Sequence, residues 1–212
     1  MHAVFAAPRS ATTSEWIRTV TLAEFVGFSA PAIAGALTVN IAEWIAFLIL
    51  ISAGTLEGLV LGIGQGSVAK HALPRFPRRA WVSATALGAG LAWLVAMLPS
   101  IFGDQLSQAS TPTRIAVVAL VGTIAVLSLS VPQWLVLRHV SHRASEWIAG
   151  SALGWCAGLT VFAAIAMPLW KQGQPMLVVV AIGLLAGLAM ASTMATVTGI
   201  FFVRIVIDRS RS

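Results

Sequence analysis

The chain has 212 residues, of which 58% are hydrophobic and only 9% are charged, whereas a soluble globular domain carries about a quarter charged residues. A membrane-spanning helix needs about 20 mostly apolar residues, so several spans fit and a sizeable soluble domain beside them is excluded. Thirteen Lys and Arg against seven Asp and Glu give a net charge of +6, which we attribute to membrane topology because basic residues collect in cytoplasmic loops. We therefore expect the lipid bilayer, and no nucleic acid, as a partner.

Long apolar runs predict an all-α membrane protein with six transmembrane helices. They cover residues 16–38, 43–69, 80–102, 113–137, 145–170 and 176–205. Polar segments separate them, the clearest being residues 70–79, which hold two prolines and five basic or titratable side chains. The predicted organisation is a cytoplasmic tail at 1–15, one six-helix transmembrane domain at 16–205 and a second cytoplasmic tail at 206–212.

Basic residues are distributed unevenly between the two ends of these predicted helices. The N-terminal segment, the second and fourth loops and the C-terminal tail hold eleven Lys and Arg residues, whereas the opposite side holds only Arg114 and Lys171. This bias predicts that both termini are cytoplasmic, in a multi-pass protein of the plasma (inner) membrane with an even number of spans. Inside the apolar runs, Trp93, Trp155 and the single cysteine, Cys156, are expected to be packing residues.

Short sequences recur along the chain and predict an internal repeat. The first and fifth spans open with the same four residues, at 14–17 and 145–148. The second and fourth spans end with Gln65 and Gln133, each five residues before a basic residue, and Gly199 has the same spacing in the sixth span. We interpret the chain as three helical hairpins in parallel orientation. Such repeats build some transporters, but they also occur in proteins that transport nothing.

One of these repeated segments resembles sequences in a known group of proteins. Residues 133–138 (Gln-Trp-Leu-Val-Leu-Arg) and 146–148 (Glu-Trp-Ile) resemble motifs of uncharacterised multi-pass bacterial membrane proteins with repeated helical hairpins. The resemblance covers the second to the fifth span. It implies a repeated membrane fold and no particular activity.

Small residues follow one another at intervals of four along several spans, which places them on one helix face. In lipid, close backbone approach through small residues is a main source of packing energy between helices. The series either packs helices within the chain or docks on a partner subunit or a second copy. The candidates for docking are Gly54, Gly58, Gly62 and Gly66 on the second span and Gly183 and Gly187 on the sixth.

Two carboxyl groups lie inside the predicted spans. Glu24 follows the start of the first span by eight residues, and Glu57 precedes Gln65 by the same number. At 1.5 Å per residue, both lie about 12 Å inside the cytoplasmic boundary of adjacent antiparallel helices. A shared site there could carry a proton or bind a cation, since intramembrane carboxyl groups usually face the bundle interior or a partner. The alternative is that each carboxyl group is protonated and hydrogen-bonded to a neighbouring helix.

Gln65 and Gln133 occupy equivalent positions near the cytoplasmic ends of their helices. Each amide either hydrogen-bonds across helices or lines a cytoplasmic vestibule.

No cofactor or metal is expected, because the only clustered histidines lie in loops that would have to converge. No catalytic motif is present either: residues 62–66, with three glycines, lack the strand and the lysine of a phosphate loop. The chain is therefore not expected to be an enzyme.

Three hypotheses follow from these features. The first is a transport or substrate-binding membrane protein with a polar site at Glu24 and Glu57. The second is a non-catalytic accessory subunit that docks into a larger membrane complex through its glycine-rich helix faces. The third is an intramembrane enzyme, which no residue pattern specifically supports.

Overall fold

The computed structural model describes residues 9–38, 40–73 and 75–208, and every regular element in these ranges is a helix. The helices are α1 (Arg9–Thr38), α2 (Glu43–Ala72), α3 (Arg78–Ile101), α4 (Gly103–Gln108), α5 (Thr111–Leu137), α6 (Glu146–Leu169) and α7 (Met176–Asp208). All except α4 are long and apolar enough to cross a membrane. The prediction of six helices that are long and apolar enough to span a membrane is confirmed, and the fold is compatible with a multi-pass membrane protein.

The predicted spans agree with the helices to within a few residues at most ends. The largest difference is at the start of α1, which begins at Arg9 instead of residue 16, because a helix continues into the polar interface beyond its apolar segment. Helices α2 and α7 each end three residues later than predicted, at Ala72 and Asp208. The short helix α4 occupies a segment that we expected to be a loop. The first predicted loop includes residue 39, which lies outside the described residues.

Local sequence signals account for several helix ends. Helix α3 begins directly after Pro77, and proline is well suited to a helix start because its missing N–H needs no partner there. At the start of α5, the Ser110 side chain accepts a hydrogen bond from the backbone N–H of Thr113 at 3.4 Å. Gly173, in the connection between α6 and α7, has φ +83°, a conformation that glycine adopts without a steric penalty.

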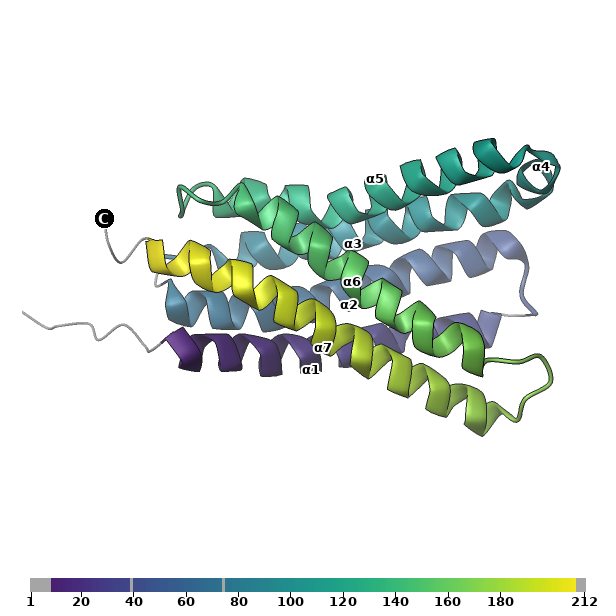
Figure 1. Cartoon of the computed structure of the whole chain (residues 1–212), viewed down its shortest axis with the longest axis horizontal. Coiled ribbons are helices and arrows are strands. Elements are labelled where there is room, and N and C mark those ends of the chain that lie inside the picture. The colour runs from purple at the N-terminus through teal and green to yellow at the C-terminus, as the bar shows by residue number, and fades with distance from the viewer. Residues whose placement is uncertain (1–8, 39, 74, 209–212) are drawn as a thin grey trace, which may run out of the picture.

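The six long helices form a closed ring. Each packs against its neighbours in the chain, with α3 packing directly on α5, and α7 closes the ring against α1. The contacts of α6 with α7 and of α2 with α3 are the most extensive, and those of α5 with α6 are the least. Figure 1 shows that α1 begins and α7 ends at the same end of the bundle, which we call the termini end, whereas α4 lies at the opposite, α4 end.

The packed core lies toward the termini end. Its largest buried side chains include Trp16, Trp81 and Trp147. In contrast, α5 has no buried residue before Ser128 and α6 has none after Gly158. These two helices diverge toward the α4 end in Figure 1. The apolar side chains left exposed along the helices suggest contact with a lipid bilayer.

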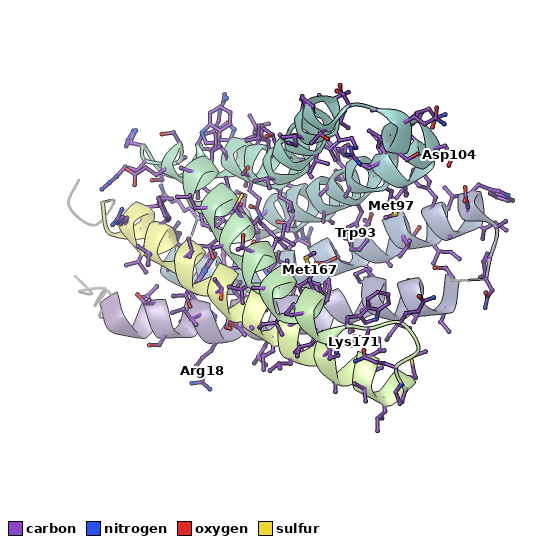
Figure 2. All side chains as sticks on the ribbon, turned by 45° about the vertical axis from the view of Figure 1, so that its right-hand side comes forward. Arg18, Trp93, Met97, Asp104, Met167 and Lys171 are labelled. Carbon is purple, nitrogen blue, oxygen red and sulfur yellow. The ribbon has the colours of Figure 1, made fainter. Side chains whose placement is uncertain are left out.

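Figure 2 shows the side chains of this divergent region. It labels Trp93 and Met97 on α3, Met167 on α6, and the charged Asp104 and Lys171 near the α4 end. Charged residues at the ends of apolar helices can remain in the polar interface of a membrane.

Candidate functional site

Glu24 on α1 and Glu57 on α2 are buried within the ring, with relative exposures of 0% and 5%. Two glycines let the helices approach closely at this depth. A Cβ atom on Gly27 would lie 3.0 Å from the backbone carbonyl oxygen of Glu57, and one on Gly64 would lie 2.5 Å from Cβ of Ala23. The two carboxyl groups lie close to each other across this interface.

Hydrogen bonding distinguishes the two carboxyl groups. The indole N–H of Trp93 on α3 donates to Oε2 of Glu57 at 2.9 Å. Among the described residues, no donor reaches either side-chain oxygen of Glu24. Two facing carboxylates offer only acceptors, so their contact becomes a hydrogen bond only when one carboxyl group carries a proton. Because two buried negative charges also repel each other, the pair can be accommodated with a proton or another cation between its members.

Gly54 makes the Trp93 hydrogen bond possible. A Cβ atom at Gly54 would overlap the indole ring of Trp93, so the ring occupies the space that a side chain would fill on α2. The sequence predicted Trp93 as a packing residue, and the structure adds a hydrogen bond to that role. Gly54, one turn from Glu57, was the only sequence feature that pointed to this hydrogen bond. It does not show that Trp93 is the residue facing it unless the rotation of α3 about its axis is known.

The other three glycines of the series spaced by four residues on α2 also face α3. A Cβ atom at Gly58 would overlap Ala89, and one at Gly62 would lie 3.0 Å from Cβ of Thr85. Gly66 packs similarly against Arg78, with a Cβ-to-Cγ distance of 3.1 Å. The glycine face of α2 is therefore used for packing within the chain.

The two candidate glycines of α7 differ from each other. A Cβ atom at Gly187 would lie 3.3 Å from the Phe28 ring on α1, whereas one at Gly183 would have no atom within 4 Å. Gly183 is thus a candidate docking residue with open space beside it among the described residues.

Gln65 and Gln133 meet inside the ring, nearer to the termini end than the carboxyl pair. The amide nitrogen of Gln133 donates to Oε1 of Gln65 at 3.0 Å and to the Thr85 hydroxyl at 2.9 Å. The Trp81 indole N–H also donates to Gln65, at 3.3 Å, and the Trp147 indole N–H donates to Oε1 of Gln133 at 2.9 Å. Both amides therefore hydrogen-bond between helices, which was one of the two expected roles.

Trp16, Trp81 and Trp147, which we call the tryptophan cluster, fill the ring at this level. The ring centroids of Trp147 lie 5.8 Å from Trp16 and 5.4 Å from Trp81, both in edge-to-face geometry. All three side chains are at most 1% exposed. Each tryptophan is near the start of its helix and donates its indole N–H to a polar side chain on another helix. For Trp16 that acceptor is the Thr198 hydroxyl on α7, at 3.2 Å.

Sequence reasoning missed Thr198. The repeat spacing aligned Gly199 with the two glutamines, and glycine has no side-chain acceptor. In the structure the acceptor is one residue earlier, and its hydroxyl also donates to the backbone carbonyl of Met194 at 2.8 Å. A shift by one residue along a helix rotates a side chain by about 100°, and spacing alone does not reveal such a shift.

The other His, Cys, Asp and Glu side chains of the described residues are not gathered into a metal-binding cluster. The described residues contain no group of three or more His, Cys, Asp and Glu side chains that could hold a metal ion. His71 lies 3.1 Å from Glu15, and both side chains are exposed. Cys156 is exposed on α6, so the prediction that its thiol is a packing residue is wrong. Periodicity could not reveal this exposure, because a lipid-facing side of a helix is as apolar as a packed one.

Comparison of the chain with models of protein families, with curated protein sequences and with solved structures gave no match.

Proposed function

We propose that this protein is a transport or substrate-binding membrane protein whose polar site is the Glu24–Glu57 pair. The observation that carries the proposal is that Glu24 is fully buried close to Glu57 and that no donor among the described residues reaches either of its side-chain oxygens. Intramembrane carboxyl groups are costly and are typical of ion pathways and proton relays. The pair takes up and releases a proton as part of its function, and the protein acts without catalysing a chemical reaction.

The position of the tryptophan cluster supports this function. Trp16 precedes Glu24 by two turns of α1, which places the cluster about 12 Å nearer to the termini end than the carboxyl pair. The cluster and the paired glutamines separate the site from that side of the membrane. Passage between the site and the termini end therefore requires these side chains to move apart.

The proposed orientation places the termini end in the cytoplasm, with the plasma (inner) membrane as the location. The eleven basic residues assigned to one side support this orientation, as does the common end at which α1 begins and α7 ends (Figure 1). A threefold internal repeat is part of the proposal. It is supported by the three hydrogen bonds from the tryptophan cluster, which join α3 to α2, α6 to α5 and α1 to α7.

Purification in a mild detergent from the native membrane tests this function, with mass spectrometry of retained small molecules and of co-purifying polypeptides. The wild-type protein is expected to retain a defined small molecule, and Glu24→Gln and Glu57→Gln are each expected to lose it. Glu43→Gln is the matched control, because Glu43 is an exposed carboxylate at the start of α2. Retention of the same molecule by all four proteins would contradict a site at the carboxyl pair.

An accessory-subunit role is the second candidate, and the open space beside Gly183 favours it. If this face docks on a partner or a second copy, Gly183→Leu abolishes co-purification or self-association while the protein remains folded. Glu24→Gln would then have little effect on the assembly. A stoichiometric partner that is insensitive to Gly183→Leu would contradict this docking face.

A further inference from the structure

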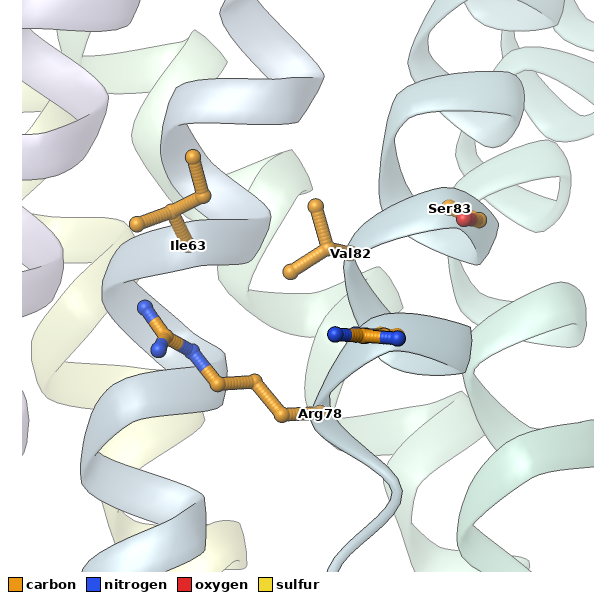
Figure 3. Close-up of a pocket in the computed structure, with 5 residues that line it drawn as sticks. Ile63, Arg78, Val82 and Ser83 are labelled. Atoms are coloured by element: carbon orange, nitrogen blue, oxygen red, sulfur yellow. The ribbon is translucent and has the colours of Figure 1, made fainter.

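A shallow groove of about 370 Å³ lies between α2 and α3, near the termini end of the bundle. It is lined by Ile63 on α2 and by Arg78, Arg79, Val82 and Ser83 on α3 (Figure 3). The groove faces outward, because Ile63 is 44% exposed and both arginines are exposed. It is therefore separate from the buried carboxyl pair and independent of the function proposed for that pair.

Gly66 determines how Arg78 lies in the groove. A Cβ atom at Gly66 would be 3.1 Å from Cγ of Arg78, so the arginine stem packs against the backbone of α2. Figure 3 shows Arg78 extending from α3 toward α2, on the loop side of Ile63. Within the described parts of the chain, neither Arg78 nor Arg79 forms an ion pair with a carboxylate. Two guanidinium groups are thus available at one end of the groove.

Apolar side chains continue from the groove toward the middle of the membrane. Ile63, Leu59 and Leu56 follow one another at intervals of four and three residues along α2, and all three are exposed. On α3, Leu87 lies one turn beyond Ser83 and is also exposed. The surface therefore combines a cationic end near the membrane boundary with an apolar track that leads into the bilayer.

We propose that this groove binds the phosphate group of an anionic phospholipid, with an acyl chain along Ile63, Leu59 and Leu56. Arg78 and Arg79 donate N–H groups to the phosphate oxygens, since guanidinium geometry matches phosphate. Their aliphatic stems remain on the apolar surface while the charged groups reach the headgroup level. The apolar track favours a lipid over free phosphate, because an inorganic ion would make no use of it.

Native mass spectrometry of the purified full-length protein tests this site, using phosphatidylglycerol and phosphatidylcholine at equal concentrations. The wild-type protein is expected to retain phosphatidylglycerol preferentially. The double variant Arg78→Gln/Arg79→Gln is expected to lower the affinity for phosphatidylglycerol by about tenfold or more, because charge-assisted hydrogen bonds to the phosphate are lost. Arg75→Gln is the matched control, because Arg75 is an exposed arginine of the connection just before α3 and is not among the residues that line the groove. Its replacement is expected to leave the affinity unchanged.

Arg79→Gln is also measured alone, because it leaves the packing of Arg78 on Gly66 intact, and it is expected to weaken phosphatidylglycerol binding by itself. Equal retention of the two lipids by the wild-type protein would overturn the proposal. Equal losses in Arg75→Gln and Arg79→Gln would also overturn it, since they would indicate attraction to general positive charge. Displacement of the lipid by millimolar inorganic phosphate would assign the groove to a free anion instead of a lipid.

Discussion

Single residues determine the chemistry of the carboxyl site. Insertion of an ionised carboxylate at the membrane centre costs roughly 2.5 to 3.5 kcal/mol, and Glu24 has no described donor that would offset this cost. Glu57 differs because the Trp93 indole donates to one of its oxygens. This difference makes Trp93 the residue through which α3 influences the pair.

Replacing Trp93 with phenylalanine removes the donor to Glu57 and retains an aromatic ring beside Gly54. We expect the free energy of unfolding to fall by about 1 kcal/mol, as is typical of hydrogen bonds between membrane helices. Unfolding in mixed micelles with increasing denaturing detergent measures this change. The control is Trp155→Phe, since Trp155 packs against the core. An equal loss in both variants would mean that the Trp93 hydrogen bond contributes nothing specific.

Gln133 makes more buried hydrogen bonds than Trp93, so its replacement is expected to be more destabilising. Gln133→Leu leaves the indole N–H of Trp147 without its acceptor and removes the donor to Gln65 and Thr85. The expected loss in free energy of unfolding is about 2 kcal/mol, because unsatisfied buried polar groups retain their desolvation cost. The same detergent titration measures it, with the exposed Gln172→Leu as control. A wild-type stability for Gln133→Leu would rule out a structural role for the glutamine pair.

At the scale of the elements, the glycine face of α2 controls how closely α3 approaches. Four glycines at intervals of four residues leave space for side chains and backbone of α3. The series therefore also aligns Trp93 with Glu57. Packing and site geometry depend on the same helix interface.

Gly58→Leu is expected to destabilise this interface by about 3 kcal/mol or to prevent folding, because its side chain would overlap Ala89. Gly183→Leu is the matched substitution in open space and is expected to leave stability nearly unchanged. Thermal stability followed by size-exclusion chromatography compares the two variants. Equal stabilities would contradict the close packing of α2 on α3.

The six long helices were predictable because membrane spans need long apolar runs whose backbone hydrogen bonds are made within the helix. The sequence also predicted that Glu24 and Glu57 lie at similar depths in the membrane, since they belong to adjacent antiparallel helices with a fixed rise per residue. The donor Trp93 was not, because it is 36 residues from Glu57 in the chain. Its role depends on the rotation of α3 about its own axis. The hydrophobicity pattern does not specify this rotation when all sides of a helix are similarly apolar.

For the whole molecule, the main feature is a ring that is packed tightly at one end and spreads at the other. The tryptophan cluster and the glutamine pair fill the termini end, whereas α5 and α6 have no buried residues near the α4 end. This asymmetry is consistent with a site that is sealed on one side of the membrane. Its proposed orientation makes the sealed side cytoplasmic.

Cysteine labelling tests that orientation, since Cys156 is the single cysteine of the chain and Cys156→Ser provides a cysteine-free background. Gln172→Cys, in the connection between α6 and α7, is expected to react with a membrane-impermeant maleimide in intact cells. Ser141→Cys, between α5 and α6, is expected to react only after the membrane is opened. The reverse pattern would contradict cytoplasmic termini.

The central claim is that Glu24 and Glu57 share an exchangeable proton inside the membrane. Infrared spectroscopy of the reconstituted protein during a pH titration measures this directly, through the carbonyl band of a protonated carboxyl group. We predict a band that titrates in the wild-type protein and in Glu43→Gln, and that is lost or displaced in both Glu24→Gln and Glu57→Gln. A band that is unaffected by either substitution, or a response to only one of them, would contradict a shared proton.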